Sequence, residues 1–255
     1  MAILKTDAIV LKGWKFGETS KILSLFSKEY GKIKVIAKGG RSLKSKFKGC
    51  LEPLSNVSVI YYHKPTRELQ LLSKTDLIDP HLRIFGDVER TTLCMAAAEL
   101  VDKAITGEEP HPDLYELLSA TISVLAEGHG FLEGALWHFQ SRFITLMGYK
   151  PTWDLCMKCG KPLSMDGGYF QAQNGGLLCH DCGGAAGGLA VSGDTLEILY
   201  WFEKGTPAEA LELRPSDHEI AEIRKMFDFY FKTHIEHMRS LKSLSIFYEF
   251  KFKLT

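Results

Sequence analysis

Five short segments in the first 75 residues alternate between apolar and polar side chains or form short apolar runs, with turn residues between them. This pattern limits the fold more than any other feature, because a period of two places successive side chains on opposite faces of a β-strand. The expected strands are residues 7–12, 20–26, 32–38, 57–62 and 68–74. Five short strands joined by turns predict a small closed barrel. An oligonucleotide-binding (OB) barrel is the natural candidate, although an SH3-like barrel would have a similar pattern.

The third strand and the loop that follows it are strongly basic. Between Gly31 and Gly49 the chain has seven lysine and arginine residues and no acidic residue. Ile33, Val35 and Ala37 should face the core, so that the lysines face outward. A positive strand and loop suit a polyanion such as a nucleic-acid backbone, although many charge runs are only solvated surface. The basic residues predicted to bind DNA are Lys32, Lys34, Lys38, Arg41, Lys44, Lys46 and Lys48.

Several aromatic residues belong to the same expected barrel, namely Trp14, Phe16, Phe47, Tyr61 and Tyr62. Some of them must contribute to its core. Phe47 lies between two lysines of the basic loop, and we predict that its ring stacks on a base, a contact that tolerates any sequence. The alternative is that Phe47 caps the barrel core.

Charge is divided unevenly along the chain, whose net charge is zero. Residues 1–80 have 15 lysine and arginine against 7 aspartate and glutamate residues, whereas residues 81–255 have 16 against 24. This asymmetry predicts an anion-binding module joined to a part with other partners. No apolar run reaches the length of about 18 residues that spans a membrane, and the N-terminus is too polar for a signal peptide. We therefore expect a cytoplasmic protein without a membrane partner, whose cysteines are thiols or metal ligands.

Helical periodicity replaces the strand pattern after Pro80. The expected helices are residues 86–106, 113–127, 131–147, 191–204 and 216–238. Ser216 and Glu219 form a capping-box pattern at the start of the last one. The final fifteen residues could extend that helix or form a β-like tail. The expected fold is α+β: an OB barrel in residues 1–80 precedes an α-helical bundle domain in residues 81–255, which carries an inserted zinc-ribbon-like lobe at about residues 150–190.

Four cysteines in that lobe form two C-x2-C pairs, Cys156 with Cys159 and Cys179 with Cys182. Each pair can offer two thiolates to one ion, and four thiolates complete the tetrahedral shell that Zn²⁺ prefers. Such a shell is closed to water, so we predict a structural zinc site. A redox role for the two pairs is the alternative. The residues between them read as a hairpin that turns at Asn174 and Gly175.

Motifs of catalysis are missing from the sequence. Gly39 and Gly40 lie in a lysine-flanked turn, but the spacing of a phosphate-binding loop is absent, as are the G-x-S-x-G and H-E-x-x-H patterns. We therefore expect no catalytic residues and a protein that is not an enzyme.

The N-terminal segments and the cysteine region together resemble the RecO family of bacterial recombination mediators. The resemblance covers nearly the whole chain and rests on Gly17–Phe26 (GETSKILSLF), Gly31, Ala37–Arg41 (AKGGR), Lys44–Ser45, Leu51–Leu54 (LEPL), Glu68–Leu69, Cys156–Gly160 (CMKCG) and Gly175–Cys179 (GGLLC). It implies an N-terminal OB fold followed by a helical domain with a zinc-finger lobe. Some members of that family lack the zinc cysteines, whereas this chain has all four.

The same resemblance implies a function in DNA repair and homologous recombination at the nucleoid. It implies binding of single- and double-stranded DNA, annealing of complementary strands, and joint action with RecR in loading RecA onto strands coated by single-stranded-DNA-binding protein, whose C-terminal tail docks on the helical domain. Two other classes stay open: an RNA-binding or ribosome-associated OB protein, and a zinc-dependent hydrolase or nuclease. The four-cysteine shell argues against the second class, because it leaves no position for an activated water.

Overall fold

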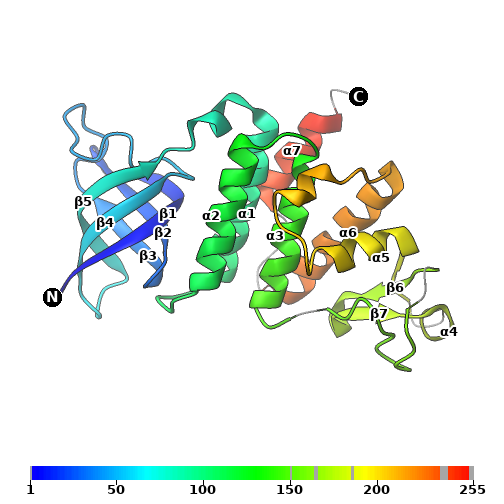
Figure 1. Ribbon diagram of the computed structural model, residues 1–255. Coiled ribbons are helices and arrows are strands. Elements are labelled where there is room, and N and C mark those ends of the chain that lie inside the picture. The colour runs from blue at the N-terminus through cyan, green and yellow to red at the C-terminus, as the bar shows by residue number, and fades with distance from the viewer. Residues whose placement is uncertain (1, 150, 164–165, 185–186, 236–240, 253–255) are drawn as a thin grey trace. The chain divides into compact units, whose positions relative to one another are not determined.

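The computed structural model describes residues 2–149, 151–163, 166–184, 187–235 and 241–252 (Figure 1). The chain forms two compact units: residues 1–127 with residues 241–255, and residues 128–240. The expected domain boundary at residue 80 stays a prediction, because the first unit combines the barrel with helices that follow it. No helix within the described residues has both the length and the apolar character needed to cross a membrane.

The first unit begins with a closed barrel of five strands. The strands are β1 (Ala2–Phe16), β2 (Ser20–Ser27), β3 (Gly31–Ala37), β4 (Asn56–His63) and β5 (Leu69–Asp79). Their order is β1-β2-β3-β5-β4, with β1 also paired to β4, and the pairing of β3 with β5 is the only parallel one among them. This is the OB topology, which decides between the two barrels that the pattern allowed.

Alternation along the strands separates the barrel core from its surface, as predicted. Ile33, Val35 and Ala37 of β3 are buried in the barrel core, together with Leu23 and Leu25 of β2. Lysines of β3 alternate with these residues and lie on the outer face. A register shift in β1 between Val10 and Lys12 is a β-bulge, so the outer face of β1 continues through residues 12, 14 and 16.

Three α-helices complete the first unit: α1 (Val88–Ala104), α2 (Pro112–Glu127) and α7 (Lys242–Phe252), with a short 3-10 helix, η1 (Leu82–Gly86), before α1. Residues 242–252 thus form a separate helix rather than an extension of α6 (Asp217–His234), and the last three residues of the predicted tail lie outside the described residues. This separate helix packs against α1, where the Glu99 carboxylate accepts hydrogen bonds from the backbone N–H groups of Lys242 and Ser243, both at 3.0 Å. Asp87 caps the start of α1 by accepting from the Arg90 N–H.

The second unit contains the remaining helices and a small three-stranded sheet. Its elements are α3 (Leu132–Leu146), β6 (Gly168–Gln171), η2 (Ala172–Asn174), β7 (Gly176–Leu178), α4 (His180–Gly183), β8 (Leu189–Val191), α5 (Gly193–Trp201), η3 (Glu209–Glu212) and α6 (Asp217–His234). The capping box predicted for α6 is present, with Ser216 and Glu219 satisfying each other's backbone N–H groups. The predicted hairpin is also confirmed, because β6 pairs antiparallel with β7.

A buried ion pair joins α3 to α6 in this unit. The Arg224 guanidinium donates two hydrogen bonds to the fully buried Glu133 carboxylate, at 2.7 and 2.6 Å. Such a pair contributes little net stability compared with an apolar pair, but removal of one partner leaves the other charge in the interior. The two helices are therefore strongly coupled through these side chains.

We expect Arg224→Ala to lower the free energy of unfolding by about 3 kcal/mol or more, because the buried Glu133 carboxylate would lose both hydrogen bonds and the positive charge that Arg224 supplies. Chemical denaturation measures the change. Lys232→Ala on the same helix is the matched control: it breaks the exposed pair with Asp228 and should cost less than about 1 kcal/mol. Equal losses of unfolding free energy in the two variants would show that the buried pair matters no more to stability than the exposed pair.

Candidate metal centre and nucleic-acid interface

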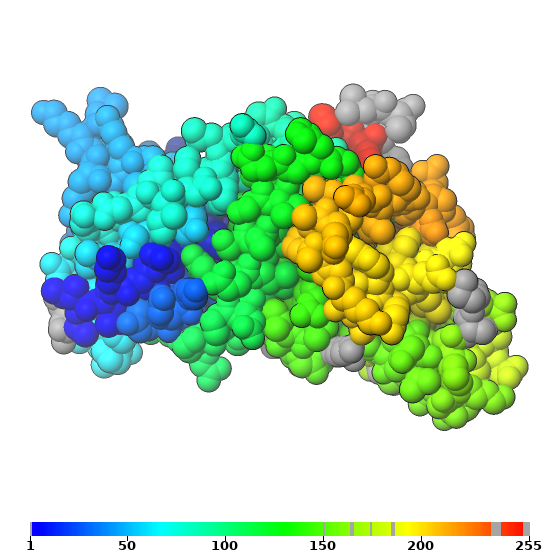
Figure 2. Space-filling view, viewed as in Figure 1, coloured from blue at the N-terminus to red at the C-terminus, as the bar shows by residue number. Residues whose placement is uncertain are grey.

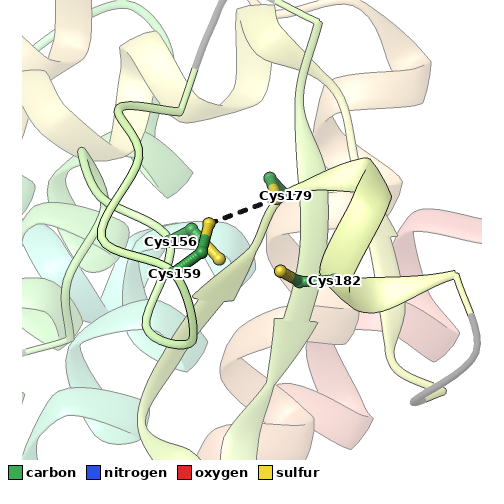
Figure 3. A group of neighbouring side chains, drawn as sticks. All are labelled: Cys156, Cys159, Cys179 and Cys182. Carbon is green, nitrogen blue, oxygen red and sulfur yellow. Dashed lines mark hydrogen bonds between the residues drawn. The ribbon is translucent and has the colours of Figure 1, made fainter.

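The four cysteines of the two C-x2-C pairs converge, and their Sγ atoms all lie within 4.8 Å of one another (Figure 3). The Sγ atoms of Cys159 and Cys179 are 3.8 Å apart. A tetrahedral shell with Zn–S bonds of about 2.3 Å requires sulfur atoms separated by about 3.8 Å. The geometry of these thiols therefore fits one Zn²⁺ ion, which Cys156, Cys159, Cys179 and Cys182 would hold.

Local backbone structure orients each pair. At the first knuckle the Gly160 N–H donates to the Cys156 carbonyl at 2.8 Å, and Gly160 adopts a φ of +69°, which favours glycine. At the second, the Gly183 N–H donates to the Cys179 carbonyl at 2.8 Å as α4 begins. His180 lies outside the thiol cluster, because its Nε2 pairs with the Asp166 carbonyl at 3.0 Å.

Electrostatics of the thiol cluster favour a bound cation. Burial raises the pKa of Cys156, but backbone N–H groups of Cys179, Cys159 and Lys158 donate to its sulfur and lower the pKa to about 6. Desolvation and hydrogen bonds with the other three thiols instead raise the pKa of Cys182 to about 12. The cluster thus accommodates a first thiolate readily and resists a further one, and a divalent cation would remove that repulsion.

The metal lobe is packed against the helices of its own unit. Phe170 of β6 is fully buried, and its ring centroid lies 6.0 Å from that of Trp153 and 6.2 Å from that of Tyr230 on α6. The His234 ring of α6 also pairs with the Ala172 carbonyl. Loss of the lobe's structure would therefore expose part of the core of the second unit.

The basic residues predicted on β3 have different environments. Lys34 is exposed, and so is Lys38 just after the strand. The Lys32 ammonium donates to the Asp102 carbonyl and lies 3.6 Å from the Asp102 carboxylate. Burial lowers the pKa of Lys32, and Asp102 partly offsets this effect. Lys32 is thus already paired within the first unit, whereas Lys34 and Lys38 are available to a ligand.

The loop of residues 38–55 connects β3 to β4 and projects from the barrel, at the upper left of Figures 1 and 2. Four of its predicted residues are exposed: Arg41, Lys44, Lys46 and Lys48. The Arg41 guanidinium also donates to the carbonyls of Gly17 and Glu18, which ties the loop to the turn between β1 and β2.

The prediction that the Phe47 ring stacks on a base is wrong. This ring is only 2 % exposed and belongs to the core cluster of the barrel, so it is not presented to a base. The Lys46 ammonium lies 5.0 Å from the centroid of that ring. The alternative interpretation, that Phe47 contributes to the barrel core, is therefore the correct one, and its ring anchors the loop to that core.

Two other aromatic rings lie outside the barrel, Trp14 at 38 % exposure and Phe16 at 50 %. In the sheet register Trp14 is opposite Ile22, which is opposite Ile36. The adjacent outward row contains Lys12 opposite Ser24, which is opposite Lys34. The exposed residues of this surface are Lys12, Trp14, Phe16, Lys34 and Lys38, and with the half-buried Ile36 we call them the basic-aromatic face.

The adjoining part of the same outer surface, which begins at Ser24, is covered by α1 and α2. Ser24 donates to the Asp102 carboxylate at 2.7 Å, and the rings of Phe26 and Tyr115 lie 6.2 Å apart. Sequence reasoning included Trp14 and Phe16 among the candidate aromatics but selected Phe47. Strand alternation in the sequence could not have distinguished them, because counting from the buried Ala8 and Val10 places Trp14 and Phe16 inward, and only the bulge turns both rings outward.

Two family profiles match this chain. The profile for "Recombination protein O N terminal" matches residues 1–81, and the profile for "Recombination protein O C terminal" matches residues 86–245. Together they cover both compact units almost completely.

The chain belongs to the RecO family. A protein of Chloroherpeton thalassium called "DNA repair protein RecO" is 28 % identical over 98 % of this chain and 100 % of its own length. Proteins of the same name from Chlorobaculum parvum and Streptomyces coelicolor are 31 % and 32 % identical, each over 96 % of this chain and over 97 % and 98 % of their own lengths. This member of the RecO family is thus similar to these three relatives over nearly their whole length, and it is a DNA-repair protein.

We expect the double variant Cys156→Ser with Cys159→Ser to lose bound zinc and to melt about 5 °C or more below the wild type, because half of the thiolate shell is removed. Elemental analysis and calorimetry measure the two effects. Cys94→Ala, which removes a thiol outside the cluster, should keep the zinc. A wild type purified without zinc, or a double variant that melts normally, would contradict a structural metal site.

Proposed function

We propose that this protein is a recombination mediator that binds single- and double-stranded DNA through the phosphate backbone and promotes annealing of complementary strands. The observation that carries the proposal is the basic-aromatic face beside the basic loop, on an OB barrel. Seven cations of these two surfaces are solvent-accessible: Lys12, Lys34, Lys38, Arg41, Lys44, Lys46 and Lys48. From Gly31 to Leu51 the chain has no acidic residue that would repel a phosphate.

Annealing needs two strands to approach despite the repulsion between their phosphates. Lysine and arginine contacts neutralise phosphates without reading sequence, because they do not touch the edges of the bases. Exposed aromatic rings add stacking that any base can use. A surface that combines both contacts would hold a strand extended and leave its base edges free to find a complement.

Lys12 supports this arrangement from the neighbouring strand. Its ammonium lies 6.0 Å from the centroid of the Trp14 ring, and it contributes to lowering the pKa of Lys32, as Lys34 also does. The lysines of β1 and β3 therefore create a shared positive potential at the ring where a base would stack.

Protein partners are part of the same proposal. Membership of the RecO family supports joint action with RecR in loading RecA onto strands coated by single-stranded-DNA-binding protein, at the nucleoid in the cytoplasm. The acidic part of the chain supports protein contacts better than DNA contacts, since residues 81–255 have eight more acidic than basic residues. The zinc ion would stabilise the second unit and would take no part in chemistry, because four thiolates leave no open coordination position.

Fluorescence anisotropy of labelled single-stranded DNA across a salt series tests the proposal directly. We expect tight binding that weakens steeply with salt and does not depend on sequence. Matched RNA should bind no better than DNA, and the DNA should stay intact during long incubation with Mg²⁺. Preference for RNA would favour a different OB-fold function, and loss of DNA would indicate a nuclease.

The triple variant Lys38→Ala, Arg41→Ala and Lys44→Ala should weaken binding and reduce the slope of log K against log salt by about 2, since each phosphate contact on a single strand contributes about 0.7. The matched control Lys5→Ala, Lys74→Ala and Arg83→Ala removes the same charges at exposed positions outside the two surfaces. Equal slopes for the two triple variants would exclude the basic loop as a DNA contact.

Trp14→Ala should weaken binding of single-stranded DNA by about 1–3 kcal/mol through the loss of base stacking. The slope with salt should not change, because no phosphate contact is lost. Phe85→Ala, which removes an exposed ring on η1, is the control and should bind as the wild type does. The same anisotropy titration measures both, and an unaltered affinity of the Trp14 variant would show that bases do not stack on this face.

A further inference from the structure

The basic loop has an apolar tip. Leu43 is 91 % exposed and lies between Arg41 and Lys44 on the surface of the loop. Single exposed apolar residues are common on proteins, so exposure by itself indicates nothing. Two further properties of the loop distinguish Leu43 from an ordinary surface leucine: the chain is anchored to the barrel on both sides of the tip, and every charged residue from Lys38 to Leu51 is basic.

Consecutive turns support the tip. The Ser42 N–H donates to the Gly39 carbonyl at 3.0 Å, and the Ser45 N–H donates to the Ser42 carbonyl at 2.9 Å. On one side of the tip, the Arg41 N–H donates to the Thr19 carbonyl at 2.7 Å. On the other side, the buried Phe47 anchors the chain in the barrel core. The backbone at Leu43 is therefore already ordered in the folded protein. Binding of a ligand would not have to offset the loss of conformational entropy that ordering this loop requires.

The charge around the tip selects the kind of partner. Arg41, Lys44, Lys46 and Lys48 are exposed, and no acidic residue occurs between Gly31 and Leu51. Duplex DNA combines phosphates on its outside with apolar base faces between its stacked pairs, which complements an apolar side chain among cations. Leucine is one of the side chains that proteins insert between base steps as wedges.

We propose that Leu43 inserts between adjacent base pairs of duplex DNA and unstacks one step, while the flanking cations hold the phosphates on either side. The inference rests on the proposed function and adds a duplex-opening contact to it. A wedge touches base faces and not base edges, so it requires no sequence and favours flexible pyrimidine–purine steps such as TA. An unstacked step is a weak point at which strands separate or re-pair.

The test uses the full-length protein and a duplex of alternating TA steps in which 2-aminopurine replaces the adenines of one strand. The fluorescence of 2-aminopurine rises when the base unstacks. We expect the wild type to raise it and Leu43→Ser to remove most of the rise, with duplex affinity and the salt slope kept within about twofold because no phosphate contact changes. Leu43→Phe, which keeps an apolar wedge, should preserve the rise.

Leu82→Ser is the matched control, because Leu82 is another exposed leucine of the first unit, at 72 %, and lies on η1 outside the basic loop. It should behave as the wild type. If the wild type binds duplex with a steep salt slope but leaves the fluorescence unchanged, or if Leu43→Ser keeps the full rise, the wedge is overturned and the proposed function stands. A serine variant that keeps the rise but loses association with a protein partner would assign Leu43 to a protein interface. If the wild type binds no DNA, the proposed function and the wedge both fail.

Discussion

Closure of the β-barrel is the constraint on which the basic-aromatic face and the basic loop depend. β1 pairs with both β2 and β4, and the short parallel contact between β3 and β5 completes the ring. Once the ring is closed, each strand residue has an inside or an outside position and cannot exchange them without moving every neighbour. The lysines of β3 are thereby held outward on a rigid backbone, and the loop that follows begins at a defined place on the rim.

The core of the closed barrel also anchors the basic loop. Phe47, Cys50 and Leu51 of the loop belong to the barrel core. The Lys21 ammonium also donates to the Leu51 carbonyl at 2.7 Å. Apolar anchors of this kind explain how a segment with many like charges keeps one conformation: burial of the anchors opposes the mutual repulsion of the cations.

Two different devices stabilise the two units. In the first unit, α1 and α2 cover one side of the barrel. The Asp102 carboxylate of α1 accepts a hydrogen bond from Ser24 and lies 3.6 Å from the Lys32 ammonium, and both of these residues are on the outer face of the sheet. In the second, the small sheet is too short to bury its residues alone, and the thiol cluster together with the contact between Phe170 and α6 holds it in place. The candidate metal site thus belongs to the second unit, whereas the basic-aromatic face and the basic loop belong to the first.

The sequence by itself determined the features that depend on local periodicity and spacing. These are the five strands, the inward and outward faces of β3, the capping box at Ser216, the hairpin between the cysteine pairs and the cysteine spacing that predicts a four-thiol cluster. Only the tertiary structure decided which aromatic rings are exposed, that Lys32 is paired with Asp102 seventy residues further along the chain, and that the final helix packs on α1. The physical reason is that alternation reports which way a strand residue points, whereas the burial of a loop residue such as Phe47 depends on side chains brought to it by distant parts of the chain.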